Sequence, residues 1–437
     1  MKTFQKILKY LFLILLWAIF LFMGTGPPAK WSYFINSGVK DESPSDFIEF
    51  VHKKARERNI GNLAVVLIEN GKNVDKYYTS ISETVDGNTL FKVASISKWI
   101  TTWAILNLVE EGRLDLDMPV NNYLTRWKLT SELYNVKEVT IRSLLTHQSG
   151  LNREYDFNDI TILDSLPSIE NALSIAKFIH KPNTVYSYSN IGFGILQLVI
   201  EEVTESSFNL YVENKVMKPL GMENSTFEYQ DSLKHKLATF YNTDNTKSPH
   251  FRYTEQAATS LYTTPNEFSK FLLAHTNQNP VLKKESIDLL NTYYFSDGGY
   301  FGQGLGVRIY DTSIANHTMI GHNGLGRWAI NSSAIIDLDS KDGVIIFCNG
   351  SMDFAKYLGN IWLHWNKGIV TDSVQFENLN KMIKLLVIGA LVIIISGFVL
   401  ERRKKTVGNN MQNGNKPYAG LLCLHEAFSA SKKNEKL

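Results

Sequence analysis

Cysteine and net charge are both scarce in this chain. Its 437 residues include only two cysteines, Cys348 and Cys423, and its formal net charge is +2. So small a charge gives no reason to expect a nucleic acid as a partner. The sequence also contains no zinc-type cluster of cysteine and histidine, no Walker loop and no dinucleotide-binding fingerprint. We therefore expect neither a metal nor a cofactor.

Two apolar runs stand out from a composition that is otherwise typical of a globular protein, with 44% hydrophobic and 20% charged residues. The run from Leu11 to Met23 follows three lysines and predicts an uncleaved membrane anchor, with the core of a cleaved signal peptide as the alternative. The run from Leu385 to Leu400 has no charged residue, and the basic cluster directly after it favours a membrane helix over a buried core helix.

The charges beside these runs predict a topology. Positive charge precedes the first run and follows the second, so both basic ends are expected in the cytoplasm. The region between them then lies outside the cytoplasm at the cell membrane, and Cys348 and Cys423 lie on opposite sides, where they should not pair. Cys348 is expected to be a buried, inert thiol in a strand. The segments predicted at the two ends of the chain are a membrane anchor or signal segment (1–26), a transmembrane helix (382–400) and a basic, mostly disordered cytoplasmic tail (401–437).

The region between the two runs has strand patterns at both ends and helical patterns in the middle. Apolar, β-branched runs predict strands, and apolar residues at helical spacing predict helices. The expected strands are 63–69, 75–80, 330–338 and 343–348, and the expected helices are 95–111, 141–145, 169–179, 192–203 and 355–365. This order predicts an α+β fold, in which both ends build one antiparallel sheet and the helices form an insertion.

One Ser-x-x-Lys motif has the context of a catalytic nucleophile. Ser95 and Lys98 share one face of the expected helix, so an amine lies beside a hydroxyl that it can activate. The helix start stabilises a developing alkoxide and leaves the N–H of Ser95 for an oxyanion, while burial would lower the pKa of Lys98. Three further matches begin at Ser37, Ser174 and Ser429 and lack this context. Taken alone, the motif fits an N-capping serine and a solvated lysine better.

Two motifs that occur once each change this balance. Tyr188-Ser189-Asn190 is the only Tyr-x-Asn, where a phenol can relay a proton and an amide can hold substrate. His322-Asn323-Gly324 is the only His-x-Gly, where glycine permits close approach of a substrate. The plain alternatives are a buried tyrosine with a capping asparagine, and a turn with an incidental histidine.

The three motifs, in this order, resemble those of the serine β-lactamase and penicillin-binding-protein superfamily. The similarity is greatest to class C β-lactamase-like enzymes, esterases and D-peptidases, and it covers roughly residues 46–368. Flanking stretches also match, at 110–117, 144–151, 219–222 and 321–326. The resemblance implies an antiparallel sheet with flanking helices beside an all-helical lobe, with the active site between them.

The resemblance also implies a role for each motif residue. Ser95 is the nucleophile that forms an acyl-enzyme, and Lys98 and Tyr188 share the general-base and general-acid work. Asn190 positions the substrate amide, and His322, with Gly324, contacts the substrate carboxylate or assists proton transfer. The backbone N–H groups of Ser95 and Leu325 form the oxyanion hole.

One departure from the family pattern bears on the substrate. Class C β-lactamases usually carry lysine where this chain has His322, and histidine is charged only when its pKa allows. The sequence also lacks the Ser-Asp-Asn motif and deacylating glutamate of class A. His147 lies in one of the family-like stretches and is interpreted as structural.

These observations predict a membrane-anchored serine hydrolase that acts on an ester or amide, in a small molecule or a peptide, outside the cytoplasm. The alternatives within the superfamily are a D-alanyl-D-alanine carboxypeptidase or a β-lactamase of the cell envelope. The alternative of another class is a non-catalytic binding or sensor module, which has no need of all four motif side chains.

Overall fold

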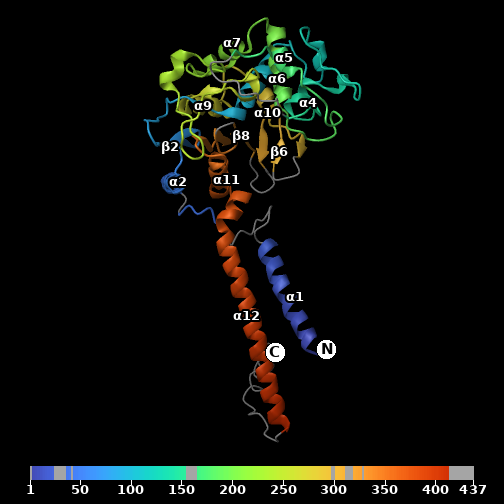
Figure 1. Ribbon diagram of the computed structural model, residues 1–437, viewed down its shortest axis with the longest axis vertical. Coiled ribbons are helices and arrows are strands. Elements are labelled where there is room, and N and C mark those ends of the chain that lie inside the picture. Colours follow the sequence, from blue (N-terminus) through green and yellow to red (C-terminus); the bar gives the residue numbers. More distant parts are fainter. Residues whose placement is uncertain are drawn as a thin grey trace, which may run out of the picture. The chain divides into compact units, whose positions relative to one another are not determined.

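The computed structural model describes residues 2–23, 36–40, 43–153, 165–296, 301–310, 318–326 and 329–412. The chain forms two compact units (Figure 1). One unit comprises Met1–Phe34 with Asn378–Leu437, and the other comprises Ile35–Glu377.

The larger unit is built on an eight-stranded antiparallel sheet with the strand order β2-β1-β10-β9-β8-β7-β6-β5. Strand β1 pairs with β10 in a register that joins Asn62 to Asn349, so the two ends of the region meet in the sheet as predicted. The strands are β1 Asn62–Glu69, β2 Lys72–Ser80, β5 Phe295–Ser296, β6 Phe301–Gln303, β7 Arg308–Tyr310, β8 Met319–Leu325, β9 Asn331–Asp337 and β10 Gly343–Asn349.

Strands β5 to β8 were not predicted from the sequence. The first three have only two or three residues each, too few to show an alternation of apolar and polar side chains. Strand β8 contains Gly321 and Gly324, which weaken a strand pattern. The omission matters because β8 carries the His-x-Gly motif into the middle of the sheet.

Helices cover both faces of the sheet. On β1, Leu63, Val65 and Leu67 pack with α2 (Pro44–Arg58) and α11 (Phe354–Lys367), while the intervening side chains belong to the core shared with the other helices. In Figure 1, α2 and α11 lie on the opposite side of the strands from α5, α6 and α7. Burial of both faces explains why β1 and β10 read as continuous apolar runs. Cys348 on β10 is buried as predicted, and this burial raises the pKa of its thiol.

The helical part of this unit contains every helix predicted there, two of them shorter than expected, together with α7 to α10, which were not predicted. Its helices are α3 Ser97–Glu110, α4 Ile141–Leu145, α5 Ile169–Leu173, α6 Asn190–Thr204, α7 Phe208–Val212, α8 Gln256–Thr259, α9 Pro265–Ala274 and α10 Lys284–Leu290. The helix expected over 169–179 ends at Leu173. The residues that follow do not continue the helix because their backbone pairs with residues 150–151. Phe178 forms a β-bridge with Leu151, and Ile179 donates its N–H to Gly150 O at 2.8 Å.

The smaller unit contains α1 (Lys2–Met23) and most of α12 (Asp372–Gln412). Both helices are long and apolar enough to cross a membrane. They contact each other through Trp17 Nε1, which donates to Leu385 O at 3.1 Å. Helix α12 continues to Gln412, so the first part of the tail predicted to be disordered is helical. The rest of that tail, with Cys423, lies outside the described residues.

Candidate active site

Ser95 lies in a tight turn rather than in the first turn of the long helix. Residues Ala94–Ile96 form a 3₁₀ turn between β3 (Phe91–Lys92) and α3, which begins at Ser97. Ala94 adopts a left-handed backbone with φ 47°, which is uncommon for a residue with a Cβ. Such backbone strain is concentrated at functional sites. Ser95 is buried, with 8% of its surface exposed, and it lines a cleft.

Lys98 is fully buried and directed at Ser95. Its Nζ lies 3.3 Å from Ser95 Oγ and 2.8 Å from each of two other acceptors, Asn190 Oδ1 and Ala258 O. Burial is the main cause that holds the pKa of Lys98 well below its usual value, and the positive charge of Arg153 adds to it. The amine is therefore driven toward its neutral form.

A neutral Lys98 fits these three neighbours well. A neutral amine has two N–H donors and one lone pair, and the two N–H groups match Asn190 Oδ1 and Ala258 O. The lone pair is then left for Ser95, whose hydroxyl can donate to it. Among the described residues, Lys98 has no carboxylate partner that would hold a proton on it. The arrangement can therefore remove a proton from Ser95.

Tyr188 is the second side chain, after Lys98, that contacts the hydroxyl of Ser95. Its hydroxyl hydrogen-bonds with Ser95, and Lys98 Nζ lies 4.9 Å from the centre of its ring. Burial raises the pKa of the Tyr188 hydroxyl well above its usual value, and the hydrogen bond with Ser95 only partly opposes that rise. The phenol is therefore protonated at neutral pH and can serve as a proton donor, whereas Lys98 can serve as the acceptor.

Asn190 is positioned by a helix cap. It is the first residue of α6, and the preceding Ser189 caps that helix by accepting from Gly192 N at 3.0 Å. Its Oδ1 accepts from Lys98, so this amide orients the lysine. That contact adds to the substrate-binding role that the resemblance implies.

The third motif lies on β8 beside the nucleophile turn. A Cβ on Gly324 would lie 2.3 Å from Val93 O and 2.2 Å from Ser332 Oγ, so only glycine allows this approach. Ser332 Oγ also donates to Val93 O at 2.7 Å. The motif glycine is thus required by contact with the segment that leads to Ser95.

His322 is neutral in this environment. Burial is the main cause that lowers its pKa to about 3; Lys98, whenever it is protonated, and the positive charge of Arg308 contribute. Its Nδ1 lies 2.7 Å from Asn323 O, and because a carbonyl can only accept, the proton of the neutral ring is on Nδ1. Nε2 then carries a lone pair. A neutral His322 can accept a hydrogen bond, but it does not supply the cation that a substrate carboxylate would need.

Strand β8 leaves part of its edge open at the cleft. Strand β7 pairs only with residues 319–321 of β8, so within the described residues no strand covers its 322–325 stretch on that side. The other side is fully paired with β9, from Met319 to Leu325. An extended substrate can therefore hydrogen-bond along this edge. Leu325, whose N–H is predicted to join the oxyanion hole, is the last residue of β8 and lines the cleft.

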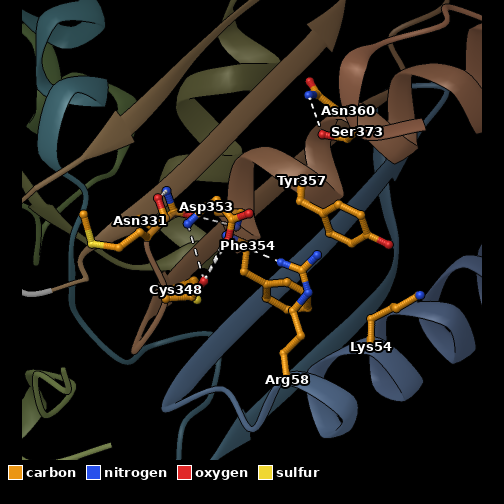
Figure 2. Close-up of polar contacts among 12 residues, drawn as sticks. Lys54, Arg58, Asn331, Cys348, Asp353, Phe354, Tyr357, Asn360 and Ser373 are labelled. Atoms are coloured by element: carbon orange, nitrogen blue, oxygen red, sulfur yellow. Dashed lines mark hydrogen bonds and ion pairs between the residues drawn. The ribbon is translucent and has the colours of Figure 1, made fainter. Parts of the chain in front are cut away.

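Asn331 supports this end of β8 and was not identified from the sequence. Its Nδ2 lies 3.3 Å from both Gly324 O and Met352 O, and its Oδ1 accepts from Ala355 N at the start of α11. Figure 2 shows Asn331 beside Asp353 and Phe354, with Arg58 across from them. Arg58 in turn forms an ion pair with Asp353 at 3.3 Å. The start of α11 is thereby fixed against the third motif.

The cleft has a volume of about 620 Å³, and the described residues that line it include basic but no acidic side chains. Its basic residues are Lys92, Arg153, Arg308 and Lys356. Sequence reasoning missed all four, because they lie on a two-residue strand, a loop, a three-residue strand and a helix start with no common motif. Arg308 is the most informative, since it lies on β7 and its charge acts on both His322 and Tyr188. No cluster of potential metal ligands occurs among the described residues.

The fold and this group of side chains define a serine hydrolase of the β-lactamase type. A model of the β-lactamase family matches residues 47–362, and the chain belongs to that family. The matched residues include all three motifs and every strand of the eight-stranded sheet, and they end within α11.

The similar proteins differ in their described activities. Protein flp of Staphylococcus aureus (strain COL) is 30% identical over 210 residues, which cover 45% of this chain but only 41% of that protein. A penicillin-binding protein homologue from Pyrococcus abyssi is 24% identical, with a TM-score of 0.64, and the aligned part covers 74% of this chain and 77% of the homologue's chain. EstCE1, a hydrolase with promiscuous acyltransferase activity, is 19% identical, with a TM-score of 0.63, and the aligned part covers 75% of this chain and 98% of the EstCE1 chain. These structures share the fold.

Proposed function

We propose that this protein is a membrane-anchored serine hydrolase that acts on an ester or amide outside the cytoplasm, through an acyl-enzyme on Ser95. The observation that carries the proposal is the arrangement around Lys98, where two acceptors take its N–H groups and Ser95 Oγ lies 3.3 Å away. In the first step the Ser95 proton moves to Lys98, and Oγ forms a bond to the substrate carbonyl. The negative charge on the carbonyl oxygen is bound by the N–H groups of Ser95 and Leu325.

The second half of acylation needs a proton on the leaving group. The Tyr188 hydroxyl, which is protonated at neutral pH, donates it, and the proton now on Lys98 restores the phenol. The leaving group departs as an alcohol or amine, and the acyl group remains on Ser95. Water then attacks the acyl carbonyl, and the same groups take its proton. They pass that proton to Ser95 Oγ as the bond between Oγ and the acyl carbon breaks, so a carboxylic acid leaves and Ser95 returns to its starting state.

The test of this mechanism is covalent labelling of the full chain. A fluorophosphonate probe should label the wild type at Ser95, and Ser95→Ala should abolish the label. Ser174→Ala, in another Ser-x-x-Lys match that lies on the exposed end of α5, is the matched control and should keep the label. Equal labelling of wild type and Ser95→Ala would exclude the covalent mechanism, and would leave a non-catalytic binding module as the better account.

A second candidate, a D-amino-acid carboxypeptidase, is favoured by the charge of the cleft. Because His322 is neutral, a substrate carboxylate would be bound by Arg308, whose positive charge in the cleft favours an anion. The Arg308→Gln variant should then raise KM for a peptide ending in D-alanine by roughly 10- to 100-fold, and should leave hydrolysis of p-nitrophenyl butyrate nearly unchanged. An equal effect on both substrates would favour a general esterase.

The proposed membrane location rests on α1 and α12, and on the basic residues at the start of α1 and near the end of α12. Membrane fractionation and protease digestion of intact cells test it together. The protein should sediment with membranes, and external protease should remove the catalytic domain but spare a fragment that contains the α12 apolar stretch. A freely soluble protein, or a domain protected in intact cells, would contradict this location.

A further inference from the structure

His147 packs directly against Tyr188 and has no part in the steps given above. The two rings lie with their centres 4.3 Å apart and their planes inclined by 33°. His147 belongs to the loop after α4 and is buried, with 1% of its surface exposed. The centre of the Phe193 ring, on α6, lies 5.5 Å from that of His147, so the rings of Tyr188 and Phe193 both pack against the imidazole.

The same residue also holds the backbone on both sides of Tyr188. His147 Nδ1 accepts from the N–H of Ser189 at 3.1 Å, and His147 O accepts from the N–H of Ser187 at 2.7 Å. The backbone of His147 is left-handed, with φ 57°, a conformation uncommon for residues other than glycine but adopted more often by asparagine, aspartate and histidine. This one residue thus contacts three consecutive residues, Ser187, Tyr188 and Ser189.

We propose that His147 is a positioning residue, which holds the Tyr188 hydroxyl at Ser95 through its ring and its Nδ1 acceptor. The proposal rests on the proposed function, since it assigns a purpose to the orientation of Tyr188. It replaces the interpretation of His147 as a merely structural loop residue.

The protonation of His147 follows from its contacts. Because Nδ1 accepts a hydrogen bond, the neutral ring carries its proton on Nε2, and a second proton on Nδ1 would break the bond from Ser189. Burial keeps the pKa of His147 well below its usual value, and any positive charge on Lys98, His322 or Arg308 lowers that pKa further. These groups face it from α3, β8 and β7, and Tyr186 and Tyr188 face it from the segment that it holds.

The other nitrogen of the ring supports a role beyond stability. Nε2 is buried and has no hydrogen-bond partner among the described residues. A buried donor without an acceptor is a cost to folding, and such groups in native proteins need an explanation. A phenylalanine would fill the same space without that cost but would lose the acceptor for Ser189. Histidine is therefore retained for Nδ1 and for the ring together.

Two variants separate the two contacts. His147→Phe keeps a ring against Tyr188 and removes the Nδ1 acceptor. His147→Asn keeps an acceptor near the position of Nδ1, removes the ring, and suits the left-handed backbone. His275→Asn is the matched control, because His275 is another buried histidine that accepts hydrogen bonds, from Trp99 and Trp103 at 2.9 and 3.0 Å, and is not part of the cleft.

Each variant of the full chain, purified in detergent, is measured for melting temperature, for the fraction labelled by fluorophosphonate, and for kcat and KM with p-nitrophenyl butyrate. We expect His147→Phe to lower kcat about 100-fold at nearly constant KM, as for a group misplaced by roughly 1 Å. His147→Asn should recover most of that loss. His275→Asn should lower the melting temperature and leave kcat per labelled site unchanged.

Three results would overturn the proposal. The first is a His147→Phe protein that loses only its folded fraction, with normal kcat per labelled site. The second is a His147→Asn protein no better than His147→Phe. The third is a ¹⁵N NMR spectrum of the wild type in which the His147 signal, assigned by its loss in His147→Asn, shows the proton on Nδ1. This last measurement needs no turnover. A wild type without label or turnover would instead count against the proposed function itself.

Discussion

Substitution of Gly324 by alanine tests whether the third motif is needed for its close contact with the nucleophile segment. The added Cβ would lie 2.3 Å from Val93 O and 3.2 Å from the Cβ of Ala94, the residue just before Ser95. Val93 O is a backbone atom, so neither neighbour can move aside by a simple side-chain rotation. The strand and the turn must therefore separate.

The expected size of the effect follows from these distances. An ordinary contact needs more than 3 Å, so the backbone must shift by close to 1 Å, and a displacement of this size at reacting atoms costs about 100-fold in rate. Overpacking of this kind also costs roughly 1–3 kcal/mol of stability. Gly324→Ala should thus reduce kcat strongly and the melting temperature modestly.

A glycine on the far face of the same sheet provides the matched control. A Cβ on Gly359 of α11 would lie 2.4 Å from Ser333 Oγ, while one on Gly324 meets Ser332 Oγ at 2.2 Å, so neighbouring residues of β9 receive a similar clash from opposite faces. Because Ser333 Oγ can rotate aside, Gly359→Ala should lower the melting temperature no more than Gly324→Ala does, and it should retain nearly full kcat per fluorophosphonate-labelled site. If Gly324→Ala keeps wild-type kcat, or if both variants lose it equally, the proposed contact between motif and nucleophile is refuted.

Three further outcomes are expected. Lys98→Met should slow fluorophosphonate labelling of Ser95 by roughly 10²- to 10⁴-fold, because the proton acceptor is lost, and an unchanged labelling rate would contradict that role. The ratio of kcat/KM between wild type and His322→Gln should stay constant from pH 5 to 8, because the pKa of His322 is lowered to about 3; a ratio that changes through pH 6.5 would show that its ionisation matters. Burial lowers the pKa of His275 to about 4, so the unfolded state binds the extra proton first, and stability should fall by up to ~3 kcal/mol as the pH drops from 6.5 to 4. Urea midpoints compared with those of His275→Gln test this, and an identical pH dependence would count against it.

The predicted secondary structure was most accurate where elements are long and regularly patterned. The runs at 63–69 and 343–348 became β1 and β10, and their pairing was inferred from their positions at the two ends of the region. Short elements set the limit. Strands β5 to β7 have no readable period, and their place in the sheet depends on pairing with β8 rather than on their own residues.

The site shows the same division. Three motifs, each with a chemical reason for its residue types, identified Ser95, Lys98, Tyr188 and His322 from the sequence, and the structure brings all four to one cleft. Arg308 and Asn331 were missed. Each acts through its position on a strand, and neither belongs to a motif that a single sequence can reveal.

The sequence by itself identified the candidate catalytic residues, one antiparallel sheet built from both ends of the region, and two apolar runs that the structure shows as helices. Only the tertiary structure decided the charges. Burial favours the neutral amine of Lys98, keeps Tyr188 protonated and favours a neutral His322, because each pKa depends on the solvent and the neighbours that folding removes or brings near. The direction of the proposed proton transfer at Ser95 is therefore a property of the fold, although the groups proposed to perform it can be identified from the sequence.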